Sequence, residues 1–189
     1  MEEYVRKNGL TKCGEELIHK LVDKNIAIDL SHSNERTFFD ITNICKKLKQ
    51  QGKNLLVIAS HSNVKSICDV PRNLTDEQLL EIKNLNGIVG IVEIKNFCRI
   101  SENLKEDFQQ DYIKHINYVR DLFGGVENIG ISTDDMTYYK VNKRYYKNLN
   151  IYILEEVAKR MRELLIENGY NNEEIEKILG ENANLKIIT

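Results

Sequence analysis

The segments NIAIDLSHSN (25–34) and NLLVIASHSN (54–63) decide the predicted fold of this chain. Each is a short apolar run that ends in the same four polar residues, Ser-His-Ser-Asn. Short apolar runs bounded by polar turns are typical of strands that are buried on both faces of a parallel sheet. The repeat therefore predicts two such strands, the first followed by His32 and the second by His61.

Outward from this repeat, predicted strands and helices alternate along the chain. Two more apolar runs, 87–94 and 128–132, predict a third and a fourth strand. Apolar residues at helical spacing predict helices over 10–25, 35–52, 76–87, 105–125, 149–168 and 171–179. The expected N-caps are Thr11, Ser33 or Asn34, Thr75 with Gln78, and Asn171 with Glu174. Such alternation predicts an α/β fold, in which right-handed crossovers build a parallel sheet covered by helices.

Three polar groups follow predicted strands: His32, His61 and the pair Asp134–Asp135. In parallel α/β proteins, catalytic groups lie at the carboxyl ends of the strands. Neighbouring strands are about 4.8 Å apart, so imidazole nitrogens from adjacent strand ends can reach one Zn²⁺ ion. The alternative is that each histidine is an ordinary loop residue.

Other polar residues have both a functional and a structural interpretation. Asp134 is a candidate general base or metal ligand, or else a helix cap or turn residue. Arg72 is a candidate for binding a substrate carboxylate through paired hydrogen bonds, or else a solvated loop side chain. His19 and His115 lie within predicted helices, and we interpret both as structural. The serines of the repeat are candidates for orienting the imidazole rings, or plain turn residues: Ser31, Ser33, Ser60 and Ser62.

Length and composition indicate one domain of ordinary size over residues 1–189. The net charge is −2 and the charges are interleaved, which disfavours nucleic acid and membrane surfaces as partners. Since no apolar run approaches the roughly 20 residues of a membrane-spanning helix and no secretion signal is evident, we expect a cytoplasmic location. Without a C-x-x-C pair, the four cysteines are expected to be reduced, buried thiols.

Four segments together resemble the membrane (renal) dipeptidase family of zinc metallopeptidases. NGLTKCGEELIHKLVDKNIAIDLSHS (8–33) resembles the family's G-L-T-x-x-G segment running into I-D-L-S-H. IASHSNVKSICDVPRNLTDEQL (58–79) resembles its S-H-S segment followed by R-N. HINYVRDLFGGVENIGISTDD (115–135) resembles its H-I-x-x-I, a glycine-ended helix and a G-x-x-x-D strand end. NGYNNEEIEKILGEN (168–182) resembles its G-Y-x-x-E-x-I-x-K-I-L-G-x-N. Because these segments keep the family's order and spacing and span nearly the whole chain, their combination is specific to the family.

The resemblance implies a (β/α)8 barrel, two zinc ions and the hydrolysis of dipeptides by metal-activated water. By motif match, His32 and His61 correspond to two histidines that hold one metal. Arg72, eleven residues after His61, corresponds to the arginine that contacts the substrate carboxylate. Asp134 corresponds to the acid that contacts substrate after the last barrel strand.

The chain also departs from the family's pattern. A (β/α)8 barrel typically takes about 250 residues, so we expect about half a barrel, matching the family's C-terminal half. The family's His-x-Asp pair, its bridging glutamate and a further substrate-contacting histidine have no counterparts, which leaves one zinc ion for this chain. Asp135 and Met136 replace the family's usual phenylalanine and aspartate.

Three ways of completing such a half barrel are open. The chain pairs with a separate N-terminal half, pairs with a second copy of itself, or refolds its first helix over the exposed surface. The first hypothesis for its function is a truncated or split zinc dipeptidase. The alternatives are a catalytically inactive assembly module and another metallohydrolase on the same scaffold, to which Asp135 and Met136 point.

Overall fold

The computed structural model describes residues 8–98, 108–134 and 146–188. Its centre is a sheet of four parallel strands in the order β1-β2-β3-β4, which is also their order in the chain. The strands are β1 (Ile28–Asp29), β2 (Val57–Ala59), β3 (Ile88–Val92) and β4 (Ile129–Ser132). All four lie inside the predicted segments, and the predicted parallel α/β fold is confirmed.

Helices connect and flank these strands. They are α1 (Lys12–Asp23), α2 (Glu35–Gln50), α3 (Asp76–Asn84), α4 (Lys95–Cys98), α5 (Phe108–Phe123), α7 (Tyr146–Glu167), α8 (Asn172–Glu176), and the π-helical turns η2 (Lys177–Glu181) and η3 (Asn184–Ile188). The four-residue helix α4 has no counterpart in the prediction, and predicted residues 105–107 lie outside the described residues. Over the described part of the chain, no helix has the length and apolar character to cross a membrane.

Capping residues explain where the helices begin. The Thr11 side chain accepts a hydrogen bond from the Gly14 N–H at 3.1 Å, as predicted for the start of α1. Of the two candidates for α2, the cap is Asn34, whose side chain accepts from the Thr37 N–H at 2.9 Å. Both predicted capping boxes are present, at the starts of α3 and α8.

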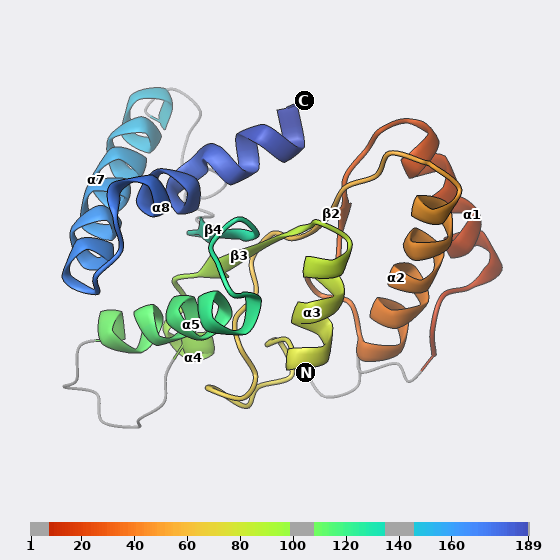
Figure 1. Cartoon of the computed structure of the whole chain (residues 1–189), viewed down its shortest axis with the longest axis horizontal. Coiled ribbons are helices and arrows are strands. Elements are labelled where there is room, and N and C mark those ends of the chain that lie inside the picture. The colour runs from red at the N-terminus through yellow and green to blue at the C-terminus, as the bar shows by residue number, and fades with distance from the viewer. Residues whose placement is uncertain (1–7, 99–107, 135–145, 189) are drawn as a thin grey trace.

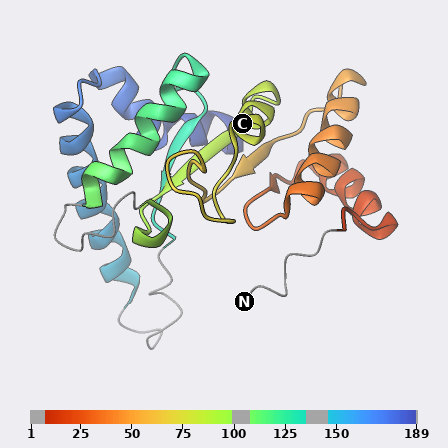
Figure 2. The ribbon, with the colours of Figure 1, turned by 90° about the horizontal axis from the view of Figure 1, so that it is seen from below.

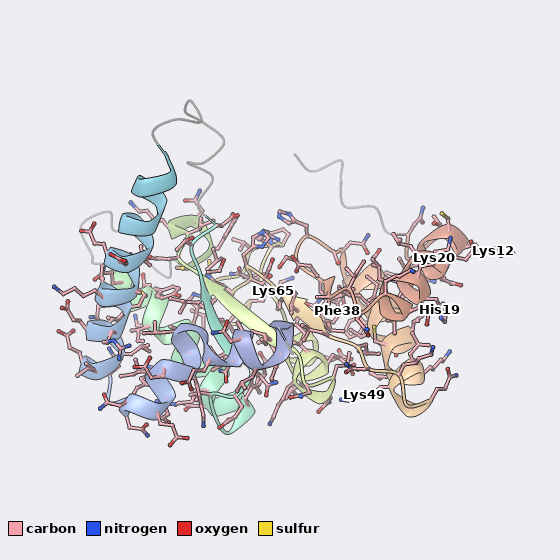
Figure 3. All side chains as sticks on the ribbon, turned by 90° about the horizontal axis from the view of Figure 1, so that it is seen from above. Lys12, His19, Lys20, Phe38, Lys49 and Lys65 are labelled. Atoms are coloured by element: carbon pink, nitrogen blue, oxygen red, sulfur yellow. The ribbon has the colours of Figure 1, made fainter. Side chains whose placement is uncertain are left out.

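The helices bury one apolar core against the sheet. Figure 1 shows α1 and α2 at one end of the molecule, α7 and α8 at the other, and the sheet between them. Figure 2 shows α1, α2, α3 and α5 as successive helices along one side of the sheet. Phe38 of α2 is fully buried and points toward the sheet (Figure 3). The core side chains therefore fix each strand end relative to its neighbour.

A partly buried ion pair joins Glu93, the residue after β3, to Arg160 of α7. Glu93, the acidic residue of the apolar segment 87–94, has a side chain that is only 10% exposed. Both of its oxygens accept hydrogen bonds from the Arg160 guanidinium, with Nη2–Oε2 at 2.5 Å. This fork-shaped contact compensates the buried carboxylate, and it accounts for a charge that the apolar pattern alone does not explain.

All four cysteines are free. Cys45, Cys68 and Cys98 are buried, as predicted, whereas Cys13 is exposed on α1. Burial raises the pKa of the Cys45 thiol to about 11 and that of Cys98 to about 12. The three buried thiols are therefore inert at neutral pH.

Candidate active site

His32 and His61 meet at the carboxyl edge of the sheet. They follow β1 and β2, which pair in register through Ile28 and Val57. The two Nε2 atoms are 3.0 Å apart. The ring centroids are separated by 5.0 Å, with a tilt of 60° between the rings. The two imidazoles therefore turn the same nitrogen toward one point.

The backbone after each strand brings these rings together. His32 has a φ of 68°, a left-handed conformation that is uncommon for residues other than glycine. The His61 N–H donates to Ser31 Oγ at 3.1 Å, which links the two Ser-His-Ser-Asn segments directly. Non-glycine residues in such conformations are concentrated at functional sites.

Asp29 organises the polar groups behind the histidines. Its Oδ1 accepts hydrogen bonds from the backbone N–H groups of Ser31 and Ser60, both at 3.0 Å. Its Oδ2 accepts from Ser60 Oγ at 2.5 Å. Ser60 Oγ in turn lies 2.6 Å from His61 Nδ1. A continuous chain of contacts thus runs from the carboxylate of Asp29 to the imidazole of His61.

The serines of the repeat have different positions. Ser60 contacts an imidazole ring directly, and Ser31 contacts the backbone of His61. Ser62 Oγ lies 3.3 Å from Ser31 Oγ. Ser33 donates its backbone N–H to the Leu30 carbonyl, as a turn residue does.

Arg72 is held close to the histidines by its own loop. Its Nη2 donates to the His61 carbonyl at 3.2 Å, and its guanidinium carbon lies 5.7 Å from the centre of the Phe97 ring. Among the described residues, the buried Nη1 has no hydrogen-bond partner. A buried donor without a partner costs free energy, so the geometry favours an added acceptor at this position.

Buried side chains beneath this loop define its shape. Asn63 donates to the Val92 carbonyl at 3.0 Å and accepts from the Val92 N–H at 2.9 Å. His115 Nδ1 accepts from the Val64 N–H, and its Nε2 lies 3.1 Å from the Cys98 carbonyl. The structural interpretation of His115 agrees with these contacts.

Asp134 follows β4 on the same edge of the sheet and is exposed. Its φ of 46° is also in the left-handed region. Its carboxylate acts electrostatically on both His32 and Arg72. The four residues singled out from the sequence are therefore brought to one place, whereas Asp135 and Met136 lie outside the described residues.

Charge and hydration tune these groups. Loss of hydration, the Arg72 guanidinium and the His61 ring lower the pKa of His32, against the opposing effect of the Asp134 and Asp29 carboxylates. Burial raises the pKa of Asp29, but hydrogen bonds from Ser60 and Ser31 outweigh it and hold that pKa below its ordinary value. At neutral pH, His32 is consequently neutral and Asp29 is ionised.

Within the described residues, the histidine pair is smaller than a complete metal site. No group of three or more His, Cys, Asp or Glu side chains there is arranged to hold a metal ion. A catalytic zinc ion usually has three protein ligands. The described part of this chain therefore has two imidazole nitrogens that could face one ion. The guanidinium of Arg72 and the carboxylates of Asp29 and Asp134 lie around them.

Asp29 is the site residue that the sequence interpretation missed. Its signal was present, because it is the acidic residue of the apolar segment 26–30. An isolated charge in a predicted buried strand needs a partner. In the structure Asp29 is exposed, and its partners are Ser31 and, from the neighbouring segment, Ser60.

The comparison with protein families decides the relationship. The model of the family described as membrane dipeptidase (peptidase family M19) matches residues 1–189. The chain belongs to the membrane dipeptidase family. Its resemblance to that family in four sequence segments is thereby confirmed.

Relatives of this membrane dipeptidase family member are longer than the chain itself. A protein of Klebsiella pneumoniae described as an uncharacterized protein in the pqqA 5′ region is 31% identical over 127 residues, which are 67% of this chain and 44% of that protein. An uncharacterized dipeptidase of Schizosaccharomyces pombe is 30% identical over 128 residues, 67% of this chain and 28% of its own length. The chain spans less than half the length of these curated relatives.

Solved structures show the same relation. A metallopeptidase of family M19, dipeptidase AC, superposes with a TM-score of 0.74 at 22% identity, over 95% of this chain and 48% of its own. A Rhodobacter sphaeroides metallopeptidase, solved with a phosphinate mimic of the dipeptide L-Ala-D-Ala, has a TM-score of 0.72 at 24% identity, over 96% and 47%. The fold of this membrane dipeptidase family member is thus about half of a TIM-type barrel.

Proposed function

We propose that the chain contributes to a zinc-dependent dipeptidase, in which His32 and His61 are metal ligands, Arg72 binds the substrate carboxylate and Asp134 transfers a proton. The observation that carries the proposal is the 3.0 Å separation of the two Nε2 atoms at adjacent strand ends. Membership of a metallopeptidase family supports the same chemistry.

The histidine pair fits a zinc ion as two of its ligands. With zinc–nitrogen bonds of about 2.0–2.1 Å, two nitrogens in a tetrahedral site lie roughly 3.3 Å apart. The observed separation of 3.0 Å needs only a small opening of the pair. A bound ion would supply Lewis acidity toward a peptide carbonyl and an attacking water. Further ligands, and the family's second ion, would have to come from outside the described residues.

Arg72 suits the carboxylate of a dipeptide, and Asp134 suits its scissile peptide bond. The guanidinium of Arg72 has a buried Nη1 without a partner in the described structure, and a carboxylate would satisfy it. Asp134 is exposed at the end of β4 and acts electrostatically on His32. From there its carboxylate can accept a proton during attack on the peptide and return it to the leaving amine.

The dipeptide is a proposal by analogy with a relative. The Rhodobacter sphaeroides structure contains a mimic of L-Ala-D-Ala, and this chain is 24% identical to that protein. We apply the substrate class of that relative, a dipeptide, to this chain, and we specify no particular pair of amino acids. The three buried free thiols support a reducing compartment such as the cytoplasm.

A zinc titration tests the proposed ligands. The purified chain should bind about one equivalent of Zn²⁺, and the double variant His32→Ala, His61→Ala should bind none, as measured by calorimetry and metal analysis. His19→Ala is the matched control, because His19 is exposed on α1, away from the sheet (Figure 3). Equal zinc binding by the double variant would overturn the ligand assignment.

An assembly module is the second candidate function. It is favoured by β1 and β4, which each have one strand neighbour among the described residues. A stable oligomer that neither binds zinc nor hydrolyses dipeptides would support this candidate over the first.

A further inference from the structure

The contacts behind the histidine pair are asymmetric. His61 Nδ1 is engaged by Ser60 Oγ at 2.6 Å, and Ser60 Oγ is engaged by Asp29 Oδ2 at 2.5 Å. In the described structure, the hydrogen bond of the His32 ring is the one that its Nε2 makes with His61. The two rings therefore differ in what determines their tautomer.

Counting protons along this chain of contacts assigns each donor. An ionised carboxylate only accepts hydrogen bonds, so the single hydroxyl proton of Ser60 is directed to Asp29. The short contact between Ser60 Oγ and His61 Nδ1 then needs its proton on the imidazole. Neutral His61 consequently carries Nδ1–H and leaves a lone pair on Nε2.

The contact between the two rings follows from this assignment. With a lone pair on His61 Nε2, the 3.0 Å contact requires that His32 Nε2 carries a proton. To bind an ion together with His61, His32 has only to move that proton to its other nitrogen. In this assignment the Nε2 lone pair of His61 is already available to a metal ion, whereas His32 must first change its tautomer.

We propose that Asp29 and Ser60 are positioning residues, which act through His61 by fixing its Nδ1–H tautomer and so exposing the Nε2 lone pair to a divalent cation. The inference rests on the proposed metal-binding function and deepens it. Outer partners of this kind commonly change metal affinity by about 10- to 100-fold when they are removed.

Two variants alter the contact without removing a ligand. Ser60→Ala deletes the hydroxyl but keeps the backbone N–H that donates to Asp29. Asp29→Asn keeps the shape but introduces an amide N–H₂ donor, which can redirect the Ser60 proton toward His61 Nδ1. The matched control is Ser33→Ala, in the same motif, since Ser33 uses its backbone N–H in the turn.

The tautomer is read by ¹⁵N NMR of the imidazoles in the zinc-free chain, and affinity by competition with a chromophoric zinc chelator. We expect Nδ1–H on His61 in the unmodified chain and in Ser33→Ala. Ser60→Ala and Asp29→Asn should gain the Nε2–H tautomer and bind zinc about 10- to 100-fold more weakly. Circular dichroism and thermal unfolding check that each variant is folded.

The outcomes separate this inference from the proposed function. If the unmodified chain binds no zinc, the proposed function fails, while the NMR spectra still decide the tautomer. Nε2–H on His61 in the unmodified chain would overturn the inference. So would variants that keep both the tautomer and the zinc affinity of the unmodified chain, even when the histidine pair itself binds zinc.

Discussion

At the scale of single residues, His115 supports the loop that carries Arg72. The imidazole is fully buried, with Nδ1 accepting from the Val64 N–H at 3.1 Å and Nε2 donating to the Cys98 carbonyl. Burial lowers the pKa of His115 below its ordinary value of 6.5, against the opposing effects of the Cys98 carbonyl and Asp111. Protonation at Nδ1 would place a proton against the Val64 N–H, so this contact exists only in the neutral form.

This pKa shift predicts a loss of stability in acid. The unfolded chain takes up a proton near pH 6.5, whereas the folded chain does so only at lower pH. The contribution of His115 is therefore complete above about pH 6.5, and it falls by up to about 1.4 kcal/mol per pH unit between the unfolded and folded pKa values. Urea unfolding between pH 7.5 and 5 measures this fall.

The variant His115→Gln isolates the effect, because an amide can accept from Val64 and donate to Cys98 without titrating. We expect its free energy of unfolding to decrease less with acid than that of the unmodified chain. The exposed residue His19 provides the control variant His19→Gln, which should keep the full decrease (Figure 3). Identical pH profiles for both variants would contradict the assignment.

Sequence reasoning brought His32, His61 and Asp134 together because strand ends in a parallel sheet share one edge, whereas Arg72 was a loop residue chosen by its spacing from His61 in the family motif. That edge is dictated by topology alone; the structure places His32, His61 and Asp134 there, and Arg72 reaches it through its hydrogen bond to the His61 carbonyl. The tautomer of His61 could not be predicted, because it depends on side-chain contacts with Asp29 and Ser60 across two strands. Their distances depend on the register between β1 and β2, and a continuous apolar run has no alternation of buried and exposed residues that would specify it.

At the scale of elements, the close approach of β3 to the end of β2 determines where His61 lies. Gly90 of β3 accepts from the Ser62 N–H at 2.9 Å. A Cβ atom added at Gly90 would lie 2.3 Å from the Ser60 carbonyl oxygen. Since backbone rather than a flexible side chain occupies that space, only glycine allows this approach.

We therefore expect Gly90→Ala to lower the free energy of unfolding by roughly 1–3 kcal/mol, and to weaken zinc binding by displacing Ser60 and His61. The matched control is Gly180→Ala, because a Cβ at Gly180 meets no atom within 4 Å and its φ of 170° is extended. Urea unfolding and zinc titration measure both effects. Equal stability of the two variants would contradict the steric argument.

Element boundaries were less predictable than element types. The predicted strand 54–60 is shorter in the structure, where β2 spans Val57–Ala59. At its end the Ser60 N–H donates to the Asp29 side chain instead of a strand carbonyl. Helix α4 (Lys95–Cys98) is too short to show a period of 3.6 residues in sequence.

At the scale of the whole molecule, the sheet corresponds to half of a closed barrel. Its outer strands in the described residues are β1 and β4, and the solved relatives contain about twice the length of this chain. Exposed edges of a sheet tend to pair with another polypeptide. The fold class could be predicted from the alternation of strands and helices. That alternation does not say what covers the outer edges of β1 and β4.

If the proposed function holds, dipeptide hydrolysis should need the part of the barrel that these residues do not supply. With saturating Zn²⁺, the chain alone should hydrolyse L-Ala-D-Ala no faster than buffer. Fusion to the other half of the Rhodobacter sphaeroides relative should raise the rate, measured by release of free alanine. The same fusion carrying His32→Ala and His61→Ala is the control. Hydrolysis by the monomeric chain alone would show that one half is sufficient.

The sequential order of the strands has a consequence for synthesis on the ribosome. Each strand pairs with the one made immediately before it. A nascent chain can therefore dock each new β/α unit onto units that have already emerged, with no need to wait for its last residues. Because each strand pairs with its neighbour in sequence, cutting the chain between two β/α units separates only one pair of strands. Genes for this architecture can therefore be split or joined between units.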